Sequence, residues 1–320
     1  MMASMVVPEV TLNSRDGITM PVIGMGTSSY PRADPETAKA AILEAIKTGF
    51  RHFDTAFIYG SEQDLGEGIA EALRLGFINS RSELFITTKL WASFAERDLV
   101  VPAIKASLRN LQVEYVDMYI IHWPFKLAKE VKSTPVEKEI VQPLDLKSVW
   151  EGMEECKRLG LARAIGVSNF TCNMLQDLLS IAKIPPALNQ VEMNPAWQLK
   201  NMREFCKAKG IHVTAFSPLG ASGTKWGDDR VLGSDVLQDI AKAKGKTTAQ
   251  ISLRWVYEQG VSMVTKSYNK DRMKQNLDIF GWSLTEEELD KLTHIHQRKG
   301  VNFASLLGPH DIVLEIDAQL

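Results

Sequence analysis

The chain is poor in the features that mark secreted, membrane-spanning or disulfide-stabilised proteins. It has only three cysteines in 320 residues, and an odd number at wide spacing argues against a disulfide framework. No run of about 18 uncharged apolar residues occurs, so we expect no membrane-spanning helix. Residues 1–10 show no basic cluster followed by an apolar stretch, and we therefore expect no signal peptide and a cytoplasmic protein.

An excess of either charge is also missing. The 37 lysines and arginines nearly balance 39 acidic residues, for a formal net charge of -2. Such a chain lacks the broad positive field that attracts nucleic acid or anionic lipid, so we expect neither partner and only local anion sites. No linker rich in Gly, Ser or Pro divides the sequence. With 45% hydrophobic and 24% charged residues, we expect residues 1–320 to form one globular domain.

Short apolar runs alternate with helical patterns along most of the chain. A hairpin is expected over residues 10–26, where the turn signal at 13–17 separates two apolar runs. From Ile23 onward we count eight strand–helix units, with later strands at 52–54, 84–88, 116–122, 162–167, 187–192, 212–217 and 263–266. The helices are expected at 34–47, 61–75, 99–111, 146–159, 172–181 and 199–208, twice before residue 263, and at 269–280 and 285–294.

Eight such units in about 250 residues predict an α/β protein with a (β/α)8 TIM barrel, an N-terminal β-hairpin and long loops on the C-terminal face. An open doubly wound sheet is the alternative. The regions 124–145, 220–232 and beyond Arg298 are too long or too polar for tight connections, and we expect them to rim a site. Two glycine-containing runs do not predict a dinucleotide-binding fingerprint. The Gly24-Met25-Gly26 run lacks the third glycine and the helix start that this fingerprint needs, and Gly66-Glu67-Gly68 lies within a helical pattern and not after a strand.

Ionisable residues end three successive predicted strands. Asp54 follows the strand at 52–54, Lys89 follows the next, His122 ends the third, and Tyr59 lies five residues after Asp54. Each alone has an ordinary structural interpretation: a turn aspartate, a solvated lysine, a hydrogen-bonded core histidine. In a barrel, however, these strand ends face one mouth, so the four groups are expected to converge there.

The four groups suit proton donation to a carbonyl. Tyrosine has an ordinary pKa of about 10. An ammonium about 4 Å away contributes on the order of 4 kcal/mol at an effective dielectric constant of about 20, enough to bring that pKa toward neutrality. Asp54 would hold Lys89 in place, and a neutral His122 would orient the carbonyl oxygen. The four residues include no Ser or Cys that could act as a nucleophile, and one His and one Asp beside a competing Lys do not make a metal site.

Several segments resemble the aldo-keto reductase family. They are GFRHFDTA at 49–56 with Tyr59, LFITTKLW at 84–91, IHWP at 121–124, IGVSNF at 165–170 and NQVEMNP at 189–195. The similarity covers residues 10–298 in order. It implies a (β/α)8 barrel, NADPH as hydride donor, a small-molecule carbonyl substrate and a monomer. It also implies a catalytic tetrad of Asp54, Tyr59, Lys89 and His122, in which Tyr59 is the general acid.

The resemblance also assigns cofactor residues one by one. The positions that hold the nicotinamide carboxamide match Ser168, Asn169 and Gln190, with Thr27 and Asp54 at the same end. Phe216 matches the stacking ring, where many relatives have Tyr, and Ser217 and Leu219 follow it. The clamp on the adenosine 2'-phosphate matches Lys266, Ser267, Tyr268, Asn269, Arg272, Gln275 and Asn276. Two cations beside a helix start suit a phosphate, whereas Lys270 and Lys274 fit a solvated helix face better.

Within the family, the sequence is most similar to a plant branch whose members act on alkaloids, polyketides and sugar uronates. Residues 26–45 most resemble the uronate reductases, which implies a substrate such as D-galacturonate. A ketone reductase of plant specialised metabolism and a non-catalytic NADPH sensor or channel subunit are the alternatives. Candidate substrate residues are Ser28, Trp91, Trp123, Trp197 and Lys126. Lys225 and Arg230 could also meet a carboxylate, although core packing for the tryptophans and solvation for the cations are the ordinary interpretations.

Overall fold

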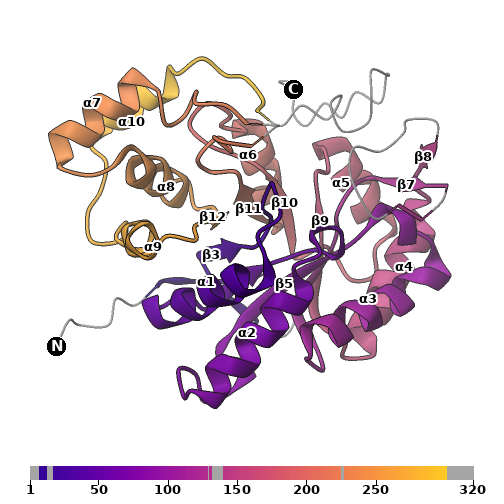
Figure 1. Ribbon diagram of the computed structural model, residues 1–320. Coiled ribbons are helices and arrows are strands. Elements are labelled where there is room, and N and C mark those ends of the chain that lie inside the picture. Colours follow the sequence, from indigo (N-terminus) through magenta and orange to yellow (C-terminus); the bar gives the residue numbers. More distant parts are fainter. Residues whose placement is uncertain (1–6, 13–16, 129, 132–139, 225–226, 301–320) are drawn as a thin grey trace.

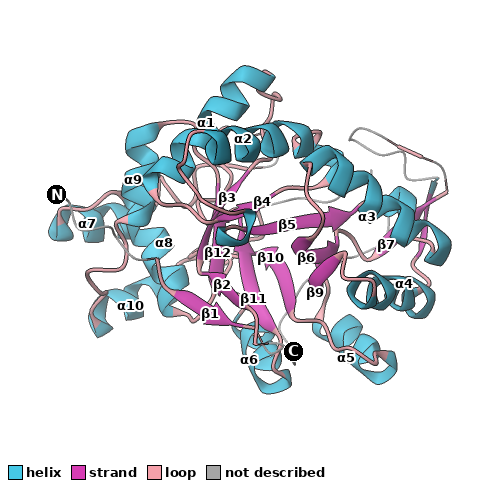
Figure 2. Ribbon diagram, turned by 90° about the horizontal axis from the view of Figure 1, so that it is seen from below, coloured by secondary structure: helices cyan, strands magenta, loops and turns pink. Residues whose placement is uncertain are grey.

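The computed structural model describes residues 7–12, 17–128, 130–131, 140–224 and 227–300. Its centre is a closed barrel of eight parallel strands with helices packed around the outside (Figures 1 and 2). The predicted (β/α)8 barrel is therefore confirmed, and the open sheet is excluded. Within the described residues, no helix has the length and apolar character needed to cross a membrane.

The barrel strands follow the predicted positions closely. Around the barrel they run β3, β4, β5, β6, β9, β10, β11 and β12, and β12 pairs with β3 to close the ring. Their bounds are β3 Ile23–Gly26, β4 His52–Asp54, β5 Phe85–Leu90, β6 Val116–Ile121, β9 Ala162–Ser168, β10 Leu188–Glu192, β11 His212–Phe216 and β12 Ser262–Thr265. All carboxyl ends therefore meet at one face, as the strand-end residues require.

The helices begin and end at recognisable caps. Asp34 accepts a hydrogen bond from the Thr37 amide and Gly49 ends the first helix, while Thr247 and Thr285 each form a capping box. The helices are α1 Pro35–Thr48, α2 Glu62–Arg74, α3 Arg97–Leu111, α4 Leu146–Arg158, α5 Cys172–Ile181, α6 Lys200–Lys209, α7 Asp235–Lys244, α8 Thr248–Glu258, α9 Lys270–Leu277 and α10 Glu286–Thr293. Single 3-10 turns occur at Phe57–Tyr59, Arg81–Glu83 and Ala92–Phe94.

Alternation along each strand separates the barrel interior from the layer under the helices. In β6, Met118 and Ile120 belong to one buried cluster, whereas Tyr119 and Ile121 pack with the helices. The N-terminal hairpin, β1 Glu9–Thr11 and β2 Thr19–Pro21, adds Met20 to the interior cluster and covers the N-terminal end of the barrel. Because side chains two residues apart share a face, the upper interior positions fall to Asp54, Lys89 and other strand-end residues.

The long segment after β6 contains a second hairpin that the sequence analysis missed. Strands β7 Phe125–Leu127 and β8 Val141–Pro143 pair antiparallel. Phe125 and Leu127 pack with Trp91 and Ala92 in a separate buried cluster. This hairpin therefore extends one wall of the barrel above the C-terminal ends of β5 and β6.

The two rejected glycine motifs have packing roles in the structure. Gly24 lies in β3, and Gly66 and Gly68 lie inside α2. A Cβ at Gly66 would come within 2.5 Å of the Leu111 carbonyl oxygen, and one at Gly68 within 2.7 Å of the Ile42 side chain. These glycines let α2 approach α1 and α3 closely, which explains their presence without any nucleotide.

Candidate active site

The four strand-end residues converge at the C-terminal mouth of the barrel. The Lys89 ammonium donates to Asp54 Oδ1 at 2.6 Å and to the Thr55 carbonyl at 2.8 Å. It also lies 4.9 Å from the centroid of the Tyr59 ring. The Tyr59 hydroxyl lies 3.3 Å from His122 Nε2, and the two rings meet edge to face. The predicted cluster therefore exists as one connected network.

Charge and burial fix the protonation states of two members. Burial lowers the pKa of Lys89, but the attractions of Asp54 and Tyr59 outweigh it and raise that pKa above its ordinary value, so the ammonium stays charged. Burial, with a smaller contribution from Lys89, holds the pKa of His122 well below its ordinary value. His122 is therefore neutral at physiological pH, as predicted.

The expected acidification of Tyr59 is wrong in its net direction. Burial raises the pKa of this phenol more than the Lys89 charge lowers it, and the Asp54 charge raises it further. The expectation from the sequence rested on the Lys89 ammonium alone, whereas the lost hydration of the phenol and the Asp54 carboxylate both act against that charge. In this structure Tyr59 therefore holds its proton firmly at neutral pH, and Lys89 acts by lowering the cost of the phenolate.

Residues after β9 and on β10 surround one side of this network. The Gln190 amide donates to Asp54 Oδ2 at 2.8 Å, and the Ser168 hydroxyl donates to the Gln190 carbonyl oxygen. Asn169 adopts a positive φ of 64° and donates to the His122 carbonyl oxygen at 3.0 Å. The Thr27 hydroxyl donates to the backbone carbonyl oxygen of Asp54, so hydrogen bonds hold both the backbone and the side chain of this residue.

Asn169 carries an unsatisfied acceptor in this region. Its buried Oδ1 atom has no hydrogen-bond partner within the described residues, and neither does His122 Nδ1. Buried polar atoms normally find partners, so an orphaned amide oxygen indicates a missing donor. The amide N–H of a carboxamide such as that of nicotinamide would satisfy it. The residues present therefore fit the cofactor that the sequence resemblance implies.

The other residues that the sequence resemblance assigns to the cofactor lie at the ends of β11 and β12. Phe216 ends β11, and Ser217 and Leu219 follow it; all three are partly exposed, and Ser217 has a positive φ of 49°. Beyond β12, the Ser267 hydroxyl accepts from the Asn269 amide, and Asn269 caps α9 by accepting from the Arg272 amide. Tyr268 is half-buried, Gln275 is exposed and Asn276 is buried.

Two cations at this helix start suit a phosphate. Desolvation and then the charge of Arg272 lower the pKa of Lys266, which shows that both positive groups share one neighbourhood. Both side chains are exposed, and the Lys266 ammonium lies 5.0 Å from the centroid of the Tyr268 ring. Lys270, by contrast, pairs with Glu44 at 2.8 Å. Repulsion between neighbouring cations is relieved by an anion, which fits a 2'-phosphate.

The aromatic substrate candidates have different surroundings. Trp91 is buried, donates to the Val131 carbonyl oxygen and meets the His122 ring edge to face. Trp123 stacks on His122 with centroids 5.6 Å apart and stays partly exposed. Trp197 is also partly exposed, while its buried Nε1 has no partner in the described part of the chain. Ser28 is partly exposed at the end of β3.

Two of the three cationic substrate candidates already have partners in the described part of the chain. The Lys126 ammonium pairs with Glu96 at 3.0 Å. Arg230 pairs with Asp228 and donates to the carbonyl oxygens of Arg298 and Lys299. Lys225 lies outside the described residues. The sequence analysis did not single out Arg32, which the structure places beside Gly60 at the C-terminal mouth of the barrel. No local motif indicates this position, because the neighbours of Arg32 come from other parts of the chain.

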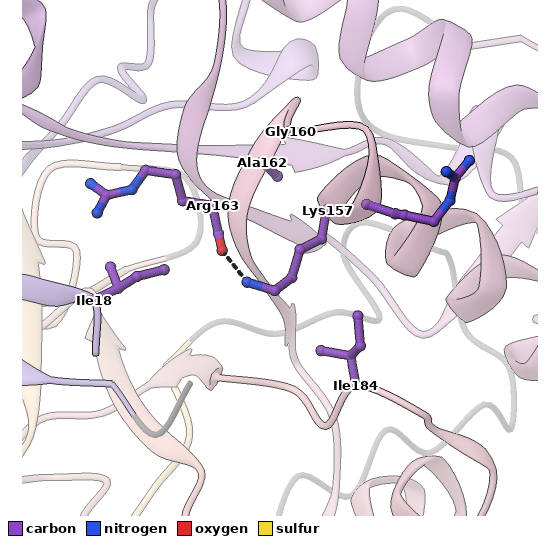
Figure 3. Close-up of a pocket in the computed structure, with 7 residues that line it drawn as sticks. Ile18, Lys157, Gly160, Ala162, Arg163 and Ile184 are labelled. Atoms are coloured by element: carbon purple, nitrogen blue, oxygen red, sulfur yellow. Dashed lines mark hydrogen bonds between the residues drawn. The ribbon is translucent and has the colours of Figure 1, made fainter. Parts of the chain in front are cut away.

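A separate hollow, whose lining residues are drawn in Figure 3, lies at the start of β9 and therefore at the end of the barrel opposite the strand-end site. It has a volume of about 430 Å³ and is lined by Ile18, Lys157, Arg158, Gly160, Ala162, Arg163 and Ile184. The Lys157 ammonium donates to the Arg163 carbonyl oxygen at 2.6 Å, Arg158 pairs with Glu155, and Arg163 pairs with Asp117. These cations are already engaged, so the hollow shares neither position nor chemistry with the strand-end site. Among the described residues, no cluster of His, Cys, Asp and Glu suits a metal ion.

Comparisons with known proteins agree with this geometry. The sequence profile of the Aldo/keto reductase family matches residues 22–297. The chain is 78% identical over 316 residues to the D-galacturonate reductase of Fragaria ananassa, covering 98% of this chain and 99% of that one. It is 53% identical over 301 residues to deoxymugineic acid synthase 1-B of Triticum aestivum, covering 93% and 95%. The crystal structure of a Bombyx mori aldo-keto reductase in complex with NADP superposes with a TM-score of 0.84 at 35% identity, covering 93% and 96%.

Proposed function

Because this chain belongs to the aldo/keto reductase family, we propose that it is an NADPH-dependent reductase of an aldehyde carbonyl, with D-galacturonate as substrate. The observation that carries the substrate is the 78% identity to a D-galacturonate reductase across nearly the whole length of both chains. The observation that supports the reaction is the connected network of Asp54, Lys89, Tyr59 and His122 at the barrel mouth.

The reaction needs a hydride at the carbonyl carbon and a proton at the carbonyl oxygen. NADPH supplies the hydride when it is bound with its carboxamide at Ser168, Asn169 and Gln190. The Tyr59 hydroxyl and His122 Nε2 lie 3.3 Å apart, so one carbonyl oxygen can accept hydrogen bonds from both. Neutral His122 orients that oxygen. Tyr59 then donates its proton to the oxygen as negative charge develops there.

The buried ion pair stabilises the tyrosinate that remains. Lys89 lies about 5 Å from the ring, where an ammonium attracts a phenolate by about 3 kcal/mol at an effective dielectric constant of about 20. Asp54 and the Thr55 carbonyl hold the ammonium in place. In the reverse direction the same tyrosinate accepts a proton from the alcohol, so the network serves both directions.

Steady-state kinetics of NADPH oxidation test the proposal. We expect the wild-type enzyme to oxidise NADPH with D-galacturonate, and Tyr59→Phe to retain cofactor binding while losing turnover. A bulky ketone from plant specialised metabolism serves as the competing substrate class. A higher kcat/KM for that ketone than for the uronate would refute the proposed substrate, and turnover in Tyr59→Phe would refute the proposed acid.

The setting of the enzyme is a further part of the proposal. We propose that residues 1–320 act as one domain and as a monomer in the cytoplasm, where the three thiols of Cys156, Cys172 and Cys206 fit a reducing compartment. Light scattering after size-exclusion chromatography tests the monomer, and fluorescent tagging in plant cells tests the compartment.

A further inference from the structure

Arg32 brings a positive charge close to the proposed acid. It lies in the connection between β3 and α1, on the face of the barrel where the carboxyl ends of the strands meet. A Cβ built on Gly60 would lie 3.1 Å from one terminal nitrogen of Arg32 and 3.4 Å from its Cζ. Gly60 directly follows Tyr59 in the chain. The absent side chain at Gly60 therefore leaves the space that the guanidinium uses.

A buried carboxylate fixes this guanidinium. Arg32 donates one hydrogen bond to Asp64 Oδ2 at 3.1 Å, and Asp64 lies on α2. The Asp64 side chain is only 6% exposed, whereas that of Arg32 is 53% exposed. Because Asp64 is held inside the fold, it orients an arginine whose charged end still reaches solvent at the rim.

Most of the hydrogen-bonding capacity of Arg32 is unused. A guanidinium carries five N–H donors, and within the described residues only one of them has a partner. The other two rim cations have fewer donors left, because Lys126 uses one of its three N–H groups on Glu96 and Arg230 is engaged by Asp228 and two carbonyl oxygens. Of these three candidates, Arg32 keeps the most donors available to a ligand among the described residues.

Arg32 lies within the reach of a six-carbon substrate from the residue that carries the proposed acid. Adjacent Cα atoms are about 3.8 Å apart and a Cα–Cβ bond is about 1.5 Å long, so the terminal nitrogen of Arg32 that approaches Gly60 lies within about 8.5 Å of the Tyr59 Cα. A six-carbon chain extends by about 6 Å between its ends at ordinary bond lengths and angles. Hydrogen bonds of about 3 Å at both ends lengthen this span. A sugar acid bound at this mouth carries a group for each residue, an aldehyde for the Tyr59 hydroxyl and a carboxylate for the Arg32 guanidinium.

We propose that Arg32, oriented by Asp64, binds the carboxylate of the sugar-acid substrate and makes this reductase prefer anionic aldehydes. This proposal rests on the proposed function, because it names the residue that recognises the acid end of the substrate at the same site. Arg32 determines specificity through binding and takes no part in the proton transfer itself.

A matched pair of sugars tests it. D-galacturonate and D-galactose share their stereochemistry and differ in a carboxylate against a neutral CH2OH group. We expect Arg32→Ala to raise the KM for D-galacturonate at least about tenfold, as loss of a charge-assisted hydrogen bond does, with kcat changed little. The kcat/KM for D-galactose should stay within about twofold. Arg32→Lys should recover part of the loss. Arg74→Ala is the matched control, because Arg74 forms an exposed ion pair with Glu71 on α2.

The outcomes separate the two proposals. If wild type reduces D-galacturonate and Arg32→Ala affects both sugars equally, the proposed function stands and the role of Arg32 is refuted. A matching rise in the KM for NADPH with both sugars would instead place Arg32 on the cofactor phosphates and also refute it. If wild type reduces D-galactose but not D-galacturonate, the proposed substrate fails, and the proposal for Arg32 fails with it.

Discussion

Replacing Lys89 by methionine tests how the buried ion pair supports catalysis. Methionine keeps the length and volume of the side chain but removes the charge that lies 4.9 Å from the Tyr59 ring. The attraction of about 3 kcal/mol between ammonium and phenolate would be lost. Since about 1.36 kcal/mol corresponds to a factor of ten in rate, we expect kcat to fall by about two orders of magnitude. The KM for the aldehyde should change much less, because the charge acts on the tyrosinate that develops in the transition state and not on the bound aldehyde.

The same substitution leaves Asp54 without its partner. Removing one member of a buried pair typically costs about 3–5 kcal/mol of stability, so Lys89→Met should unfold at a lower urea concentration. The double variant Asp54→Asn/Lys89→Met removes the uncompensated carboxylate and should regain part of that stability. Its activity should remain low, because the ammonium is still missing.

Urea unfolding followed by circular dichroism and NADPH oxidation under saturating cofactor measure the two effects separately. If Lys89→Met stays folded and its kcat lies within fivefold of wild type, then Lys89 does not stabilise the tyrosinate. Recovery of kcat in the double variant would likewise contradict the mechanism, because it would show that the Asp54 charge alone limits the single variant.

Three further predictions follow from the described contacts. Burial lowers the pKa of His52 and of His212 to about 4, so the unfolded chain binds more protons than the folded chain between about pH 4 and 6.5. The free energy of unfolding should therefore be highest above pH 6.5 and should fall on acidification by up to about 3 kcal/mol for each histidine. Urea titrations at several pH values measure this, and a pH dependence in His52→Gln equal to that of the wild type would contradict it. Arg272→Ala should raise the KM for NADPH about tenfold or more without changing the KM for NADH, which cofactor titrations measure; an unchanged preference for NADPH would remove Arg272 from the phosphate site. Lys126→Ala should change the KM for D-galacturonate less than twofold, since its ammonium already pairs with Glu96; a tenfold rise would restore Lys126 as the carboxylate receptor.

Local signals were enough to predict the barrel and the convergence of its strand ends. The caps at Asp34, Thr247 and Thr285 depend on neighbours three residues away, so the sequence shows them directly. Parallel strands impose a common direction, which placed Asp54, Lys89 and His122 at one face before any distance was known. The roles of these residues and of the cofactor positions remain proposals for the experiments above.

Features that depend on distant partners were not predictable. Strands β7 and β8 are three residues each and form by packing on Trp91 and its neighbours, which no periodicity reveals. Arg32 and Asp64 are 32 residues apart, so their ion pair leaves no motif. The raised pKa of Tyr59 depends on how much water the folded structure removes, a quantity that residue types alone do not supply.

The alternation of side chains inside the barrel limits how chain length can vary among related enzymes. Phe85 belongs to the interior cluster, and Lys89 follows it at an even spacing in β5. Inserting one residue between them would turn the lysine toward the helices, and inserting two would raise it by about 6.6 Å and away from Asp54. Insertions and deletions should therefore be tolerated in the connections beyond the strand ends more readily than within the barrel strands. Related enzymes can then change the loops that would contact the substrate while the strands keep Asp54, Lys89 and His122 at the same positions.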